Sequence, residues 1–363
     1  MAVKHPSSPV TLGVVANPVS ARDIRRVVAN AGNLQITDRV NIVLRMLQAA
    51  RAAGVERAVL MPDRGGIRAL LERHLGRSKA SAHAADDDGR LPAIEFLDFE
   101  PTSTVDDTFA ATRLLLQQGV QAIVVLGGDG THRAVVRELV GTGSRTPVAG
   151  LSTGTNNAFP EMREPTITGL AAGLVAAGRV PEPEALAPNK LVEVAITGRD
   201  GAVRHDIAIV DAVITHDRTV GARALWKTSS LAACYLAFAE PEAIGLSSIG
   251  GLLHPIGRRE RGGLAVQLAH DDAQALVTLH APIAPGLVLP VPVAGWQRMV
   301  PGEPLPVQLQ AGTVALDGER ELAFDAGERV TVTLREDAFR TVDVARCMAA
   351  AARDGLFRSL PHP

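Results

Sequence analysis

Short apolar runs alternate with helical patterns over the first 160 residues. Apolar side chains recur at helical spacing between Val40 and Leu47, and Thr104 to Asp107 resembles a capping box at the start of another helix. The candidate buried strands are residues 11–16, 58–61, 93–99, 122–126 and a short run before Ser152. Strands that alternate with helices through short connections predict a parallel, doubly wound α/β sheet.

The pattern changes after about residue 160. A small-residue helix is expected over residues 169–178, and Pro181, Pro183 and Pro188 mark a linker. Most later apolar segments indicate strands, namely residues 191–196, 207–214, 264–268, 275–279, 314–316 and 330–334. One helical island is expected over about residues 222–238, with core side chains Trp226, Tyr235 and Phe238. This part of the chain reads as a β-rich domain.

The tail is expected to be helical again over residues 337–356, with Val344, Met348, Ala351 and Ala352 on one face. A terminal helix after a β-rich domain needs an apolar partner, so we expect it to pack back on the first domain. The predicted division is therefore an α/β domain over residues 1–160, a β-rich domain over 161–336 and a returning helix over 337–363.

Composition narrows the function classes. The net charge of −2, from 37 basic and 39 acidic residues, gives no electrostatic footprint for nucleic acid or an anionic membrane. Cys234 and Cys347 lie in apolar surroundings, fit buried free thiols and form no CxxC motif, so the cytosol is the default compartment. The N-terminus lacks the apolar core of a signal peptide, and no apolar run is long enough to predict a membrane span.

Two polar loops follow neighbouring apolar runs. Gly127-Gly128-Asp129-Gly130-Thr131 ends the run 122–126, and Ser152-Thr153-Gly154-Thr155-Asn156-Asn157 ends the next one. Because parallel strands end at the same edge of a sheet, both loops are expected where ligands of open α/β folds bind.

The first loop is suited to phosphate. Gly127 and Gly128 allow close backbone approach, while Thr131 and the N-terminus of the following helix offer N–H donors. Asp129 could accept a proton from an attacking hydroxyl or help to hold Mg²⁺, and the alternative is a turn aspartate that bonds the loop backbone. With no following Lys and no GxGxxG pattern, the loop favours phosphoryl transfer over passive dinucleotide binding.

Other candidates are weaker on their own. The Ser152–Asn157 loop could hold phosphate or ribose, or cap a helix before Ala158. Asn17 and Ser20 stand in a turn that could bind phosphate oxygens or be a plain turn. Aspartates 86–88 indicate a solvated loop rather than a metal site.

Two acidic positions of the second domain need an explanation. Asp317-Gly318 is first of all a hairpin signal, and Glu319 follows it. Asp211 falls within an apolar strand pattern, where a charge is either paired or functional.

These motifs together resemble a known superfamily. The GGDGT loop is similar to the signature of NAD kinases, diacylglycerol kinases and sphingosine kinases. The Asn17–Ser20 turn resembles the NPxSG turn of the lipid-kinase branch, and Asp317-Gly318-Glu319 looks like a hairpin of both branches. Over nearly its whole length the chain resembles the ATP-NAD kinase-like proteins, the group that includes acetoin-catabolism protein X.

The resemblance implies a kinase that uses ATP and Mg²⁺ in a cleft between an ATP-binding first domain and an acceptor-binding second domain. Asp129 would orient or deprotonate the acceptor hydroxyl, with Asp317 and Glu319 approaching from the second domain. The residues implied to hold the substrates are Asn17, Ser20, Gly127, Gly128, Gly130, Thr131, Ser152, Thr153, Gly154, Thr155, Asn156, Asn157 and Asp211.

The expected reaction is phosphorylation of the 2′-hydroxyl of NAD to give NADP. The sequence departs from NAD kinases at Val210-Asp211, where they carry an Asn-Glu pair, and it has no match to their TPTGSTAY motif. A kinase of another small metabolite or lipid, and a non-catalytic nucleotide-binding regulator, are the alternatives. An aromatic content of 3% without a basic amphipathic helix disfavours the lipid. An edge strand of the second domain could mediate a homo-oligomer.

Overall fold

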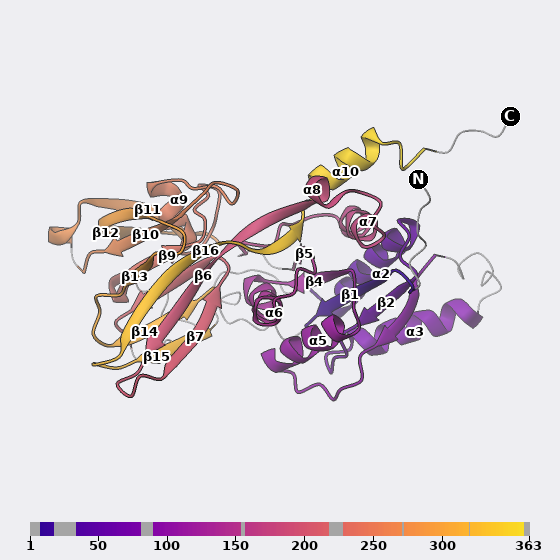
Figure 1. The fold of residues 1–363 in the computed structure, drawn as a ribbon, viewed down its shortest axis with the longest axis horizontal. Helices are drawn as coiled ribbons and strands as arrows, with labels where there is room; N and C mark the ends of the chain where they lie inside the picture. The colour runs from indigo at the N-terminus through magenta and orange to yellow at the C-terminus, as the bar shows by residue number, and fades with distance from the viewer. Residues whose placement is uncertain are drawn as a thin grey trace.

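The computed structural model describes residues 8–17, 34–80, 90–153, 157–217, 228–270, 272–318 and 320–358. The chain forms two lobes joined by long strands (Figure 1). Over the described residues, no helix is both long and apolar enough to cross a bilayer.

The first lobe is a parallel sheet covered by helices on both faces. Its strands lie in the order β3-β2-β1-β4-β5. They are β1 (Thr11–Ala16), β2 (Arg57–Leu60), β3 (Ala93–Phe96), β4 (Ala122–Gly127) and β5 (Val148–Ser152). The helices are α2 (Ile36–Ala52), α3 (Ile67–Ala80), α5 (Val105–Gln117), α6 (Asp129–Thr142) and α7 (Pro165–Ala176).

Burial explains why β1 and β4 read as unbroken apolar runs. Both strands are buried at every position. Val14 packs into the core under α2 and α7, whereas Val15 packs into the opposite core under α5 and α6. Strands buried on both faces are typical of parallel sheets. The predicted doubly wound sheet is therefore confirmed.

The second lobe is built mainly from antiparallel strands. The sheet order β11-β12-β10-β9-β8-β14-β15 belongs to this lobe alone, and β16, β6 and β7 extend the sheet of the first lobe. The strands are β6 (Leu186–Thr197), β7 (Val203–Ala208), β8 (Asp211–Thr215), β9 (Leu231–Leu236), β10 (Gly263–Leu268), β11 (Val277–Ala284), β12 (Leu287–Met299), β13 (Pro304–Pro306), β14 (Gly312–Leu316), β15 (Arg320–Phe324) and β16 (Arg329–Val342). The helical pieces are α8 (Glu182–Ala185), η3 (Thr228–Ser230), α9 (Ser247–Leu253) and η4 (Asp272–Gln274).

The predicted helical island is wrong over its described part. Residues 231–236 form β9, which is hydrogen-bonded between β8 and β10. The sequence Leu-Ala-Ala-Cys-Tyr-Leu suits a helix locally, but sheet pairing on both edges overrides that preference. Tyr235 and Phe238 are buried as expected, and Trp226 lies outside the described residues.

The terminal helix, α10 (Val344–Arg353), returns to the first lobe as predicted. Cys347, Ala350 and Ala351 join the core under α2 and α7. The helix begins later than the predicted residue 337, because residues 337–342 belong to β16, where Phe339 pairs with Asn189 of β6. Cys234 and Cys347 are buried free thiols. The predicted domain boundaries stay predictions, and α7 packs against α2 of the first lobe.

Candidate active site

The two polar loops lie side by side. Strands β4 and β5 are parallel neighbours, and their last paired residues are Gly127 and Ser152. The loops that follow therefore leave the same sheet edge, as their spacing in the sequence predicts.

A side chain at Gly127 would clash with Thr131, and one at Gly128 would have to displace the Asn157 side chain. A Cβ on Gly127 would lie 2.6 Å from the side chain of Thr131, and a Cβ on Gly128 would lie 2.7 Å from Oδ1 of Asn157. Gly128 is the N-cap of α6, a 14-residue helix whose first turn points its N–H groups toward the loop. This arrangement fits the phosphate-binding role predicted for the loop.

Asp129 ties the first loop to the second. It is the first residue of α6, and its two carboxylate oxygens accept hydrogen bonds from the N–H groups of Ala158 at 2.9 Å and Phe159 at 2.8 Å. The side chain is half-buried. The geometry thus gives Asp129 the backbone-bonding task of a turn aspartate, and its catalytic role stays a prediction.

The second loop continues into a bend, not a helix. No helix begins at Ala158, because α7 starts only at Pro165, so the helix-cap interpretation of this loop is wrong. Asn157 donates its side-chain N–H to Oγ of Ser152 at 2.8 Å. Thr153 is buried.

A cavity of about 710 Å³ opens beside the second loop and is lined from both lobes. Ser152 and Asn157 lie on one side, and Glu240 and Arg258 on the other. The further charged residues of its wall are Glu161, Glu242, Arg259 and Glu260. Among the described residues, the lining has four carboxylates against two guanidinium groups. The cavity therefore suits a polar ligand.

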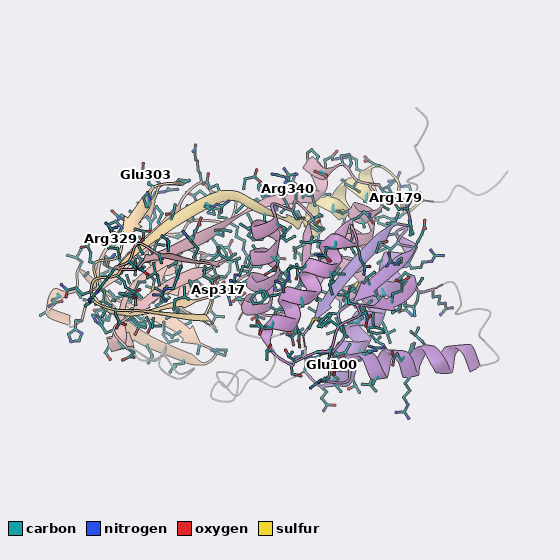
Figure 2. All side chains as sticks on the ribbon, turned by 60° about the horizontal axis from the view of Figure 1, so that its bottom comes forward. Glu100, Arg179, Glu303, Asp317, Arg329 and Arg340 are labelled. Carbon is teal, nitrogen blue, oxygen red and sulfur yellow. The ribbon has the colours of Figure 1, made fainter. Side chains whose placement is uncertain are left out.

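Asp317 is brought to the junction of the lobes by a hairpin, as its Asp-Gly pair predicts (Figure 2). Asp317 and Gly318 both have positive φ, 48° and 68°. The Asp317 side chain is fully buried and accepts hydrogen bonds from the backbone N–H groups of three successive residues, 209 to 211. The single strand predicted over residues 207–214 is therefore two strands, β7 and β8, with Asp317 holding the corner between them.

Burial raises the pKa of Asp317 to about 7, and the nearby charge of Asp129 adds to this increase. The Arg133 guanidinium and the backbone N–H donors act in the opposite direction. The carboxylates of Asp129 and Asp317, which come from different lobes, are thus close enough to interact electrostatically. The predicted catalytic role of Asp317 stays a prediction, and its geometry is that of a backbone anchor.

Arg133 connects the lobes and was not singled out from the sequence. It stands one helical turn after Asp129, is buried, and reaches Asp206 at 3.5 Å and Asp317 at 3.9 Å. Arg137, one turn further, approaches Asp206 at 3.7 Å. The i, i+4 spacing from Asp129 was the available signal, since such residues share a helix face.

The remaining predicted site residues are placed as follows. Asn17 is buried and donates its side-chain amide to Thr104 and Thr108, which ties the end of β1 to α5. Asp211 is buried, and its backbone bonds Asp317 in both directions. Ser20, Gly154, Thr155, Asn156 and Glu319 lie outside the described residues. The substrate-binding roles of all these residues stay predictions.

The side chains near the glycine loop decide how Mg²⁺ would be held. The described residues contain no group of three or more His, Cys, Asp or Glu side chains that could hold a metal ion. A protein cage for Mg²⁺ is therefore not built from them. One carboxylate, Asp129, beside a loop predicted to bind phosphate fits the usual Mg²⁺ site, in which substrate phosphates and water supply the other ligands.

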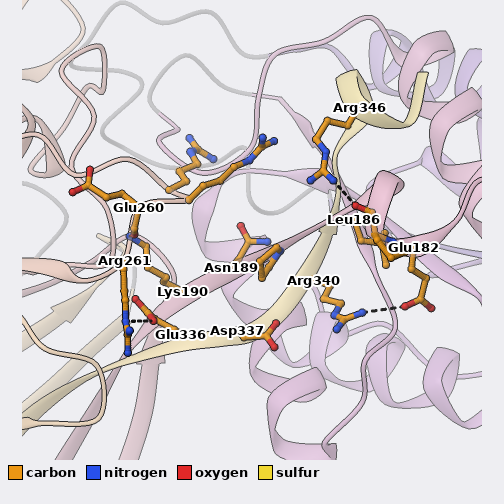
Figure 3. A pocket seen from close by; sticks show the side chains of 14 residues that line it. Glu182, Leu186, Asn189, Lys190, Glu260, Arg261, Glu336, Asp337, Arg340 and Arg346 are labelled. Atoms are coloured by element: carbon orange, nitrogen blue, oxygen red, sulfur yellow. Dashed lines mark hydrogen bonds and ion pairs between the residues drawn. The ribbon is translucent and has the colours of Figure 1, made fainter. Parts of the chain in front are cut away.

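A second cavity, of about 650 Å³, lies between β6, β16, α10 and the loop before β10 (Figure 3). Its basic side chains are largely paired: Arg261 with Glu336, and Arg340 with Glu182. At its edge, Lys190 is buried and donates to three backbone carbonyl groups, those of residues 257, 260 and 262. Burial lowers the pKa of Lys190 to about 8.

Comparison with known proteins agrees with this architecture. The model of the ATP-NAD kinase N-terminal domain matches residues 13–180, and that of the acetoin catabolism protein X C-terminal domain matches residues 190–337. Acetoin catabolism protein X of Cupriavidus necator is 59% identical over 352 residues, which cover 97% of this chain and 95% of that protein.

Solved structures of low sequence identity were also found. Yeast NADH kinase complexed with NADH is 12% identical, with a TM-score of 0.49, over 98% of this chain and 90% of that one. A putative diacylglycerol kinase from Bacillus anthracis is 13% identical, with a TM-score of 0.45, over 93% and 98%. On the sequence identity and the two matching domain models, the chain belongs to the acetoin catabolism protein X family, whose first domain is of the ATP-NAD kinase type.

Proposed function

We propose that the protein is an ATP-dependent kinase that phosphorylates a hydroxyl group. The observation that supports this most directly is the position of Asp129. It stands at the N-terminus of α6, between the Gly127–Gly128 turn and a second polar loop that borders a cavity. The ATP-NAD kinase N-terminal domain model, which includes this region, supports the same reaction class.

Different residues of the chain would bind ATP, orient the acceptor and accept its proton. The Gly127–Thr131 backbone and the first turn of α6 would bind ATP phosphates, and Ser152 and Asn157 would orient the acceptor from the cavity. The acceptor's hydroxyl oxygen would bond to the γ-phosphorus of ATP while the bond between that phosphorus and ADP breaks. Asp129 would accept the proton that the hydroxyl group loses. Bound Mg²⁺ would supply charge neutralisation at the phosphates.

NAD is the leading acceptor, and its 2′-hydroxyl the target. Support comes from the family's ATP-NAD kinase domain and from a polar cavity of about 710 Å³ that both lobes line. Ligand sites of this size can bury most of a small organic molecule.

A second candidate acceptor is a small uncharged metabolite with a hydroxyl group. The specific observation is the excess of carboxylates in the cavity wall, which includes Glu161, Glu240 and Glu242. Carboxylates accept hydrogen bonds from hydroxyl groups and repel the diphosphate of a dinucleotide. The same polar wall favours a water-soluble acceptor over a lipid.

The test is a turnover assay with purified protein, ATP, Mg²⁺ and NAD, in which NADP is measured by enzymatic cycling. We expect NADP formation that Asp129→Ala abolishes, while Glu138→Gln, near the other end of α6, keeps it. ADP release with other hydroxyl compounds but not with NAD would favour the second acceptor. Nucleotide binding by calorimetry without turnover over a broad acceptor panel would instead indicate a non-catalytic regulator and overturn the proposal.

A further inference from the structure

Arg258 reaches from the second lobe to the backbone beside Asp129. It lies in the loop before β10, and its Nη1 donates to the carbonyl oxygen of Phe159 at 2.6 Å. Its Nη2 donates to the carbonyl oxygen of Ala158. Its Nε donates to Glu240 at 3.0 Å. One guanidinium group thus bonds the second polar loop and a carboxylate of the cavity wall at once.

Two aromatic rings lie close to this guanidinium group. Its central carbon lies 4.5 Å from the ring centre of Phe238 and 5.7 Å from that of Phe159. The side chain is 27% exposed, so water screens these contacts only in part. Planar stacking and forked donation are properties of arginine that lysine lacks.

Asp129 bonds the same peptide group from the other side. The carbonyl oxygen of the peptide between Ala158 and Phe159 accepts from Arg258, and its N–H donates to Oδ1 of Asp129. Hydrogen bonds that share one peptide group polarise and strengthen each other. A shift of the guanidinium group is therefore transmitted to the carboxylate through a single rigid plane.

The loop that carries Arg258 is itself firmly held. Lys190 donates to the carbonyl groups of Gly257, Glu260 and Gly262, and Glu336 accepts from the N–H of Gly262. The arginine thus stands on a fixed support in the second lobe, and a displacement of that lobe moves it.

We propose that Arg258 is a positioning residue that couples the acceptor cavity to Asp129. A ligand that bonds Glu240 in the cavity changes the partner of the Arg258 Nε, and the guanidinium group passes this change to Asp129 through the Ala158–Phe159 peptide. The inference deepens the proposed kinase function and rests on it for its catalytic consequence, but the structural coupling can be measured without turnover.

The first experiment follows hydrogen exchange of the Ala158 and Phe159 amides in the wild type, Arg258→Lys and Arg258→Gly. We expect both variants to lower protection of these two amides, with melting temperatures near the wild type for Arg258→Lys. Arg298→Ala is the matched control, because Arg298 pairs with Glu260 in the same region without contacting residues 158–159. Unchanged exchange in both Arg258 variants overturns the proposal.

The second experiment uses chemical rescue. Millimolar guanidinium ion should restore amide protection in Arg258→Gly, and sodium ion at the same concentration should not. In the turnover assay Arg258→Lys should lower kcat about ten- to a hundredfold with little change in KM for ATP, since small misplacements of reacting groups have costs of this size. Lost protection with an unaltered kcat would overturn the positioning role. Absence of turnover in the wild type would overturn the proposed function alone, because the exchange result still decides the coupling.

Discussion

At the residue scale, His132 is a histidine that the fold keeps neutral. It is fully buried on α6, with Nδ1 2.9 Å from the carbonyl oxygen of Gly128, and its Nε2 has no hydrogen-bond partner among the described residues. A Cβ on Gly150 would lie 2.8 Å from that Nε2. Burial lowers the pKa of His132 to about 4. The buried imidazole is therefore uncharged in the folded protein at neutral pH, and it contacts the carbonyl group of Gly128 in the glycine loop.

This lowered pKa predicts a pH-dependent stability. Between pH 6.5 and pH 4, His132 is protonated in the unfolded chain but not in the folded chain. The contribution of neutral His132 to the free energy of unfolding is therefore full above pH 6.5 and is lost as the pH falls toward 4. The free energy of unfolding of the wild type relative to His132→Gln should fall by about 3 kcal/mol from pH 7 to pH 4. Urea unfolding of both proteins across this range measures the difference, and a pH-independent difference contradicts it.

The stability that Asp317 contributes should change with pH in the opposite direction to that of His132. Its folded pKa of about 7 exceeds the ordinary value of 3.8, so its contribution is full below pH 4 and is lost as the pH rises through 7. In Asp317→Asn the loss of stability relative to wild type should therefore be larger at pH 4.5 than at pH 8. Urea unfolding at the two pH values checks this, with Asp325→Asn, on the exposed turn before β16, as the control. A loss that is larger at pH 8 contradicts it.

At the element scale, the sequence predicts best where an element is specified by its own pattern. The run ending in Gly127 is a fully buried strand that needs only apolar residues and a glycine stop, and the Asp317-Gly318 hairpin needs only its turn. Strand β9 could not be predicted in this way, because its pairing with β8 and β10 depends on residues far along the chain. The same holds for Arg133 and Arg258, whose partners lie in the other lobe.

The glycine loop gives a test at this scale. Gly127→Ala would place a methyl group 2.6 Å from the Thr131 side chain, so the loop must shift away from the position proposed for phosphate. We expect nucleotide binding to be lost and stability to fall by about 1–3 kcal/mol. Gly141→Ala, within the same helix α6 and with nothing within 4 Å of its added Cβ, should stabilise the protein by about 0.5–1 kcal/mol. Calorimetric titration with ATP and thermal unfolding compare the two, and equal ATP affinity in both variants contradicts this role of Gly127.

At the scale of the whole molecule, two kinds of connection join the lobes. Strands β6 and β16 run from one lobe to the other, and Thr341 at the end of β16 pairs with Val148 of β5, so the backbone of one sheet is continuous across the junction (Figure 1). The second connection is ionic, since the buried Arg133 of α6 meets Asp206 and Asp317 of the second lobe. The strands join the lobes through the backbone, and the ion pairs join them through side chains one helical turn from Asp129.

The ionic connection predicts separable unfolding when it is cut. Arg133→Met leaves the buried Asp317 without its cation and leaves Asp206 with Arg137 alone, which should destabilise the protein by about 3–5 kcal/mol. Arg137→Met removes a 40% exposed arginine from the same helix and the same Asp206, and should cost under about 1 kcal/mol. Trp296 belongs to β12, so its fluorescence reports the second lobe, whereas far-ultraviolet circular dichroism is dominated by the helices of the first. In the wild type and in Arg137→Met the two signals should change at one urea concentration. In Arg133→Met they should separate. Coincident transitions in Arg133→Met would mean that β6 and β16 alone couple the lobes.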